Sequence, residues 1–129
     1  MTIEAAFYST LSAHAGLIAK VSTRIYPLVL PQDCRLPAVC IRRVSDIPEY
    51  LLDLAVALQE TRMQVSSFAE TLAEALAIGA QVKLALVGLS GSHGGVTIGD
   101  IRIENENDLY EPDTDIYHIP IDFMVYYSE

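Results

Sequence analysis

Residues 68–87 carry the pattern that most constrains how this chain folds. Their apolar side chains recur at helical spacing, and the shared face holds Leu72, Ala75, Leu76, Gly79, Val82 and Leu86. Ser67 and Glu70 match the S-x-x-E capping box, in which each side chain satisfies a backbone amide at the start of a helix, and Gly88 follows the last apolar turn. We therefore predict a long amphipathic helix over residues 68–87, packed on a core.

The segments on both sides of this helix show strand patterns. Residues 38–44 and 55–67 precede it, and residues 96–104 and 116–127 follow it. These four segments are rich in β-branched residues or alternate between apolar and polar side chains, as expected for strands with one buried face. An extended piece over residues 24–30, cut by a proline, offers a fifth strand.

A second helix is predicted at the N-terminus. The apolar side chains of Ile3–Leu17 form one helical stripe, Thr2 caps its start and Gly16 ends it. The order of elements predicts an α+β fold: an antiparallel sheet of four to five strands, with the long helix and the N-terminal helix packed on one face. A length of 129 residues suits one domain spanning residues 1–129.

Two residues interrupt the predicted C-terminal strands. Gly99 lies inside its strand, where a bulge would let Val96, Ile98, Ile101 and Ile103 share one face. Pro120 cannot donate a ladder hydrogen bond, so the last strand is predicted to be an edge strand or to be bulged there, and its pairing stays open.

The charge of the chain is unevenly distributed. It has 8 Lys and Arg against 17 Asp and Glu, a net charge of −9, and residues 96–129 hold nine of the acids with one base, Arg102. This balance argues against direct nucleic-acid binding, because phosphate contacts depend on Lys and Arg. No apolar run reaches the roughly 18 residues of a membrane span, and no basic segment of a secretory signal precedes the first apolar residues. These features predict a protein that stays in the cytosol.

No segment carries a strong catalytic or cofactor signature. The glycine-rich residues 88–95 follow a predicted helix instead of opening one and lack Gly-Lys-Ser/Thr, which favours a flexible connection over a phosphate-binding loop. Ser90, Ser92 and His93 lie together without a nucleophile elbow. We predict a protein that is not an enzyme, with no catalytic residues and no cofactor.

The acidic residues 104–115 are the best metal candidate in the sequence. They offer many oxygen donors of the kind calcium prefers, but their spacing is not that of an EF-hand. We predict a solvated acidic turn and no metal site. A small cytosolic ligand- or metal-binding module that uses this turn stays open as an alternative, as does a hydrolase of unfamiliar type.

Seven stretches occur in the same order as in a known family. They are Thr2-Ile-Glu-Ala-Ala-Phe-Tyr8, Thr23-Arg-Ile-Tyr-Pro-Leu28, Leu36-Pro-Ala-Val39, the long helix within residues 65–86, Gly95-Val-Thr-Ile98, Asp108-Leu-Tyr-Glu-Pro-Asp113 and Asp122-Phe-Met-Val125. Together they span nearly the whole chain. In this respect the sequence resembles the tail terminator (tail-completion) proteins of long-tailed phages, prophages and gene-transfer agents.

The resemblance implies a structural subunit without catalytic residues. It implies a ring, typically of six copies, that caps the head-proximal end of the tail tube, stops tube polymerisation and meets the head-completion protein. The implied partners are therefore other copies of the chain, the tail tube protein and the head-completion protein, with no nucleic acid or membrane. The implied location is the host cytoplasm during assembly and then the virion or gene-transfer-agent tail. A neck or head–tail connector protein of similar size is the alternative within the same machine.

Two groups of residues are candidates for contacts in such an assembly. The predicted subunit or tube interface consists of Tyr50, Leu109, Tyr110, Glu111 and Pro112, because tyrosine suits interfaces and residues 109–112 lie within the family motif. The acids predicted to face the ring lumen or its rim are Glu104, Glu106 and Asp108, because carboxylates repel the phosphates of DNA passing through a tail channel.

Overall fold

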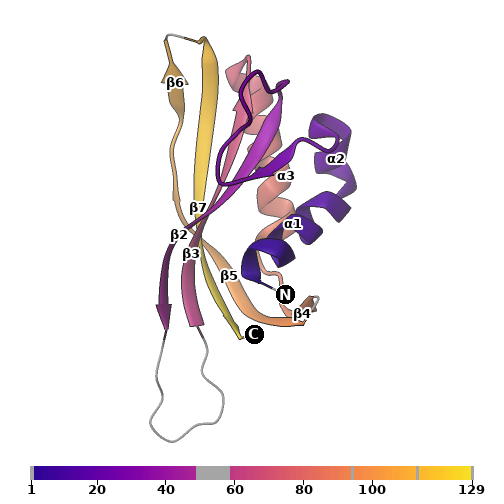
Figure 1. Ribbon diagram of the computed structural model, residues 1–129, viewed down its shortest axis with the longest axis vertical. Coiled ribbons are helices and arrows are strands. Elements are labelled where there is room, and N and C mark those ends of the chain that lie inside the picture. Colours follow the sequence, from indigo (N-terminus) through magenta and orange to yellow (C-terminus); the bar gives the residue numbers. More distant parts are fainter. Residues whose placement is uncertain (1, 49–58, 94, 113, 129) are drawn as a thin grey trace, which may run out of the picture.

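The chain folds into a strongly twisted sheet with its described helices on one side (Figure 1). The computed structural model describes residues 2–48, 59–93, 95–112 and 114–128. The helices are α1 (Ile3–Ala13), α2 (Ala15–Val21) and α3 (Leu72–Leu86). The strands are β1 (Ile25–Pro27), β2 (Ala38–Pro48), β3 (Gln59–Ala69), β4 (Gly91–His93), β5 (Val96–Glu106), β6 (Leu109–Glu111) and β7 (Ile116–Ser128).

The described strands form one seven-stranded sheet in the order β1-β2-β3-β7-β5-β4, with β6 also paired to β7. The predicted α+β class is confirmed, but the predicted numbers of four to five strands and two helices are wrong, because the described residues form seven strands and three helices. The additional strands β4 and β6 have three residues each and lie in segments predicted as a glycine-rich connection and an acidic turn. One pairing, between β1 and β2, is parallel, whereas the others are antiparallel.

The core lies between the sheet and the helices. Along β7 the predicted alternation is confirmed, because the side chains that face the helices are at most 1% exposed: Ile119, Ile121, Phe123, Val125 and Tyr127. On β3, Met63 and Val65 are buried in the same layer. α3 approaches this layer closely at Gly79, where a Cβ atom would lie 3.5 Å from Ile121 Cδ1.

The start of α3 differs from the prediction. The helix begins at Leu72, and its N-cap is Thr71, whose Oγ1 accepts a hydrogen bond from the Glu74 amide at 3.2 Å. Ser67 is instead a buried residue of β3, and its hydroxyl donates to the Ala75 carbonyl at 3.1 Å. Thr71-x-x-Glu74 also fits the capping-box pattern. The prediction of a capped helix start was therefore correct, but it placed the cap four residues too early in the sequence.

This later start also changes the buried face of α3. Ile78 is fully buried, whereas Leu72 and Leu76, predicted to be buried, are 39% and 42% exposed. The other predicted members of the face, Ala75, Gly79, Val82 and Leu86, are buried.

The N-terminal helix is divided in two. Thr2 caps α1 as predicted, but the helix ends at Ala13, and His14 adopts an extended conformation before α2. Gly16 therefore does not end a helix. It lies within α2 where a Cβ atom would approach Gln81 Oε1 to 2.2 Å, so only glycine allows Gln81 of α3 to reach His14 Nε2 at 3.0 Å.

The bulge predicted at Gly99 is confirmed by a register shift between Ile98 and Asp100. A second shift, between Ile103 and Asn105, was not predicted, and Ile103 is 44% exposed instead of buried with its neighbours. The remaining apolar positions, Val96, Ile98 and Ile101, are buried on the helix side.

Pro120 is not on an edge strand, because β7 pairs with β3 on one side and with β5 and β6 on the other. On that other side β5 ends opposite Ile121 and β6 begins opposite His118. Between them the Asn107 amide donates to the Pro120 carbonyl at 3.2 Å. In a β-strand, the backbone nitrogen and the carbonyl of the same residue point to the same side. The backbone nitrogen of Pro120 has no hydrogen to donate, and it therefore faces the break between β5 and β6.

The two capping patterns make different predictions for stability. We expect Thr71→Ala to lower the free energy of unfolding by about 1 kcal/mol, because the Glu74 amide loses its acceptor. Glu70→Ala, the matched control, is expected to change it by less than about 0.5 kcal/mol, since Glu70 is exposed and precedes the cap. Urea unfolding of both variants measures the difference. A larger loss for Glu70→Ala would contradict this assignment.

Candidate functional site

The predicted interface residues lie mostly on the hairpin formed by β6 and β7, which projects at one end of the sheet (Figure 1). Leu109 and Tyr110 are 47% and 48% exposed, and Glu111 and Pro112 are also exposed. The structure therefore brings these four residues together on one accessible strand and its turn. Tyr50, the fifth predicted residue, lies outside the described residues.

Tyr110 is held in place without being buried. Its ring packs against Tyr117 of β7, with centroids 4.9 Å apart and planes tilted by 42°. Its hydroxyl donates a hydrogen bond to Asp115 Oδ1, and this bond raises the pKa of Tyr110 above its ordinary value. Across the turn, Thr114 donates to Glu111 Oε2 at 3.2 Å. The hairpin thus presents an aromatic ring whose orientation is fixed before any partner binds.

The three predicted lumen acids are not equivalent. Glu104 lies at the second irregularity of β5 and Asp108 lies in the break between β5 and β6, and both are exposed. Glu106 contacts Lys83 of α3, with Nζ to carboxylate distances of 3.1 and 3.2 Å. Its charge is therefore partly balanced on the helix side of the sheet. Residues 104–115, predicted as one acidic turn, are largely the end of β5 and the whole of β6.

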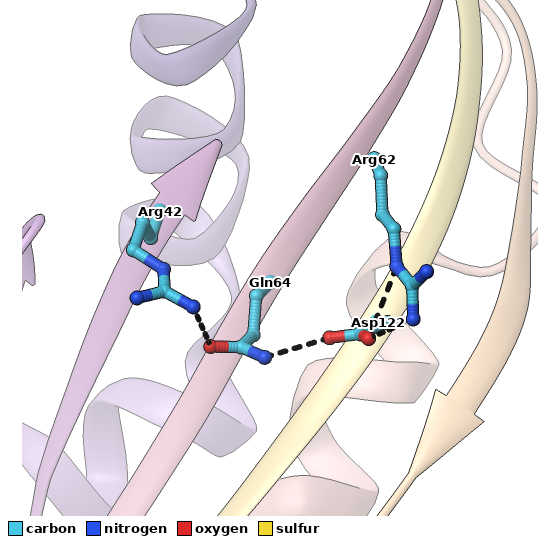
Figure 2. Close-up of polar contacts among 4 residues, drawn as sticks. All are labelled: Arg42, Arg62, Gln64 and Asp122. Carbon is cyan, nitrogen blue, oxygen red and sulfur yellow. Dashed lines mark hydrogen bonds and ion pairs between the residues drawn. The ribbon is translucent and has the colours of Figure 1, made fainter. Parts of the chain in front are cut away.

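The sheet face away from the helices carries a polar network that the sequence patterns did not indicate. Figure 2 shows four side chains joined across β2, β3 and β7. Arg42 donates to Gln64 Oε1 at 3.0 Å, and Gln64 donates to Asp122 Oδ1 at 2.8 Å. The other carboxylate oxygen of Asp122 accepts from Arg62, whose Nε is 3.1 Å away.

The network explains how a carboxylate is tolerated in a largely buried position. The side chain of Asp122 is 10% exposed and that of Arg62 is 36% exposed. Both carboxylate oxygens have donors, which offsets the cost of removing the charge from water. Alternation along strands identified the polar positions of this face, but the pairing depends on register, which alternation does not specify.

Beside the network, a smaller hollow of about 260 Å³ lies under residues 28–30. Phe68 and His118 stack there, with ring centroids 4.3 Å apart and planes inclined by 12°. Burial lowers the pKa of His118 below its ordinary value, which favours the neutral ring. The stack and the network thus place aromatic and polar contacts side by side on the face away from the helices.

A hollow with a volume of about 870 Å³ lies between α1 and the β1–β2 edge of the sheet. We call it the edge groove and define it by the lining residues Tyr8, Ile25, Leu28, Ile41, Arg42 and Arg43. Arg43 contacts Glu4 of α1 at 3.0 Å. Sequence reasoning missed this groove, because its residues come from three separate segments.

The residues with chemical potential in the sequence do not form a recognisable reaction centre. His93 contacts the Ser90 carbonyl at 3.0 Å, a backbone contact and not a hydroxyl–imidazole pair. Within the described ranges, no three His, Cys, Asp or Glu side chains lie close enough to hold a metal ion. No helix in this part of the chain is long and apolar enough to cross a membrane.

The fold and these surfaces define a small α+β protein whose conspicuous features are exposed strand edges and a groove. The family described as "Tail completion protein gp17" matches residues 5–128, and the chain belongs to this family. The resemblance inferred from the sequence is thereby confirmed, and the protein is a tail completion protein of the kind found in phage-type virions.

The fold is also found in a solved particle. A chain of the structure described as "Virion of native gene transfer agent (GTA) particle" matches with a TM-score of 0.77 at 22% identity. The match covers 98% of this chain and 95% of that chain. At this identity the likeness establishes the shared fold. Among curated protein sequences, none matches the chain significantly.

The polar network supports a stability prediction. We expect Asp122→Ala to lower the free energy of unfolding by about 1–3 kcal/mol, because Arg62 and Gln64 lose their acceptor in a largely buried position. The partial exposure of Arg62 keeps the loss below that of a fully buried pair.

Asp100→Ala is the matched control for this variant. Asp100 pairs with Arg102, whose side chain is 72% exposed, and its loss is expected to change stability by less than about 0.5 kcal/mol. Equilibrium urea unfolding measures both variants. Equal effects would show that the network contributes no more than a surface ion pair.

Proposed function

We propose that this tail completion protein acts as a ring of identical subunits on the head-proximal end of a tail tube. The observation that carries the proposal is the family match over residues 5–128, and the whole chain 1–129 is taken as one functional unit. The ring stops tube polymerisation and joins the tail to the head-completion protein. Six copies are expected from the family resemblance. The protein works without catalysis and without a cofactor, first in the host cytoplasm and then in the particle.

The β6–β7 hairpin is the surface proposed to form subunit or tube contacts. Leu109 and Tyr110 are exposed apolar side chains on a short strand that, among the described residues, pairs with β7 alone. Tyr110 is preorganised by Tyr117 and Asp115, so little side-chain entropy is lost when a partner covers it. An oriented, half-exposed tyrosine has the properties of a residue that contributes strongly to an interface.

The Tyr110→Ala variant tests whether Tyr110 contributes to an interface between proteins or to the core of this one. We expect a melting temperature within about 5 °C of that of the original protein, because the ring contributes one aromatic contact and is half exposed. We expect ring formation, followed by electron microscopy of protein mixed with tail tubes, to be abolished.

The control for this variant is Leu84→Ala, which removes an apolar side chain that is 71% exposed on α3, away from the hairpin. This variant should leave both the melting temperature and ring formation unchanged. If Tyr110→Ala unfolds the protein, Tyr110 belongs to the core and the interface assignment is wrong. Particles in which the protein sits in the neck, away from the tube end, would favour the connector alternative.

Glu104, Glu106 and Asp108 are proposed to line the lumen or its rim. The exposure of Glu104 and Asp108 supports this role, whereas Glu106 shares its charge with Lys83. Repulsion of phosphate is screened beyond about 8 Å at physiological salt, so these acids act only if the passage is close to them. Under this proposal the ring lets DNA pass without holding it.

Replacing the three acids with Gln, Gln and Asn tests this role. We expect the triple variant to fold and to form rings, but to bind double-stranded DNA measurably tighter than the original ring at 20 mM salt. The difference should vanish near 300 mM salt, as measured by fluorescence anisotropy. Replacing Glu70, Asp33 and Glu60 with Gln, Asn and Gln, at positions outside the hairpin and the edge groove, is the charge-matched control. Tight DNA binding by the unmodified ring would contradict the proposal.

A further inference from the structure

The edge groove has the properties of a surface that a partner covers. Tyr8 is 46% exposed and Leu28 is 63% exposed. Leu28 also has a φ of +69°, a conformation that bulky apolar residues rarely adopt. Within the described ranges β1 pairs only with residues 39–41 of β2, so the edge of β2 beyond Ile41 has no strand partner there.

The charge of the groove is opposite to that of the β6–β7 hairpin. The described lining of the groove holds one acid, Glu4, and two bases, Arg42 and Arg43, so it has one more base than acid. Arg43 contacts Glu4, and the guanidinium of Arg42 donates to Gln64. Residues 103–116 contain no Lys or Arg, and the exposed acids of this range flank Leu109 and Tyr110: Glu104, Glu106, Asp108, Glu111 and Asp115. Both surfaces therefore combine apolar side chains with charge, and the charges are complementary.

We propose that the edge groove of one copy receives the β6 strand of a second copy, an inference that rests on the proposed ring function. Leu109 and Tyr110 enter beside Tyr8 and Leu28, and Arg43 faces Glu111. The volume of about 870 Å³ is sufficient for several side chains.

The positions of the two surfaces fit a ring. β1 and β6 lie on opposite sides of the central β3–β7 pair. A contact between them is therefore head-to-tail, and every copy uses one groove and one hairpin. Repetition of such a contact closes into a ring when the rotation per subunit permits. The charge complementarity favours a second copy over the tail tube protein as the occupant.

Charge reversal tests this contact. Arg43→Glu makes the groove acidic, and Glu111→Lys makes the hairpin basic. Each variant alone brings like charges together, so we expect self-association and capping of tail tubes to weaken at least about tenfold. Sedimentation velocity and electron microscopy of tube ends provide the two readouts. The matched controls are Arg102→Glu and Glu70→Lys, exposed residues outside both surfaces, which should assemble like the original protein.

An equimolar mixture of Arg43→Glu and Glu111→Lys provides the decisive result. When the two variants alternate in an even-membered ring, every groove again faces a hairpin of opposite charge, so we expect assembly to recover. Leu28→Asp is a second groove variant that keeps the fold, because Asp tolerates the positive φ better than Leu. It should weaken assembly like Arg43→Glu, and it replaces that variant if circular dichroism shows that Arg43→Glu is unfolded.

The outcomes separate this contact from the proposed function. If the original protein neither self-associates nor caps tubes, the ring function itself is wrong. If it assembles, and the folded groove variants assemble as well as Arg102→Glu, the groove–hairpin contact alone is wrong. The groove–hairpin contact is also wrong if the mixture of Arg43→Glu and Glu111→Lys stays unassembled while the original protein assembles. If the groove variants form rings but no longer cap tubes, the groove binds the tail tube protein and not a second copy.

Discussion

The pairing of β3 with β7 is the constraint on which the rest of the structure depends. It joins residues 59–69 to residues 117–127, two segments about fifty positions apart, in an unbroken antiparallel ladder. β2 adds to one side of this pair, and β5 and β6 add to the other. α3, which connects the two halves of the chain, packs back on the same two strands. Closing so long a loop costs entropy that only the completed ladder and its buried layer offset.

The same ladder divides the molecule into two chemically different faces. Residues that point to the helices are mostly apolar and almost fully buried, whereas their neighbours on the other face form the Arg42–Gln64–Asp122–Arg62 network. Asp122 sits between the buried Ile121 and Phe123, so a shift of one residue in the register would place its charge in the core. The network therefore favours the native register as well as stabilising the fold.

The function proposed for this tail completion protein depends on the borders of its sheet. Two of these border regions, the edge groove beside β1 and β2 and the hairpin of β6 and β7, differ in shape and charge. An isolated protein with such edges risks uncontrolled association. In a family whose members complete tails, the same edges are suited to controlled association, because contacts between unlike surfaces add subunits in one direction.

The sequence alone determined those features that depend on local periodicity. The alternation in residues 119–127 identified β7 and its buried face, Gly99 identified a bulge, and the order of short motifs identified the family. The exposed, acidic character of residues 104–112 also followed from composition. These properties belong to single segments, so they are visible without knowledge of their partners.

Only the tertiary structure decided the features that depend on pairing between distant segments. Two capping patterns, at Ser67 and at Thr71, fit the start of α3 equally well in sequence. The structure uses the second because β3 continues to Ala69, where it pairs with Tyr117. Likewise, Pro120 is tolerated in a central strand because its nitrogen faces the break between β5 and β6. Register, strand order and the edge groove arise from contacts between residues far apart in the chain, and no local pattern encodes them.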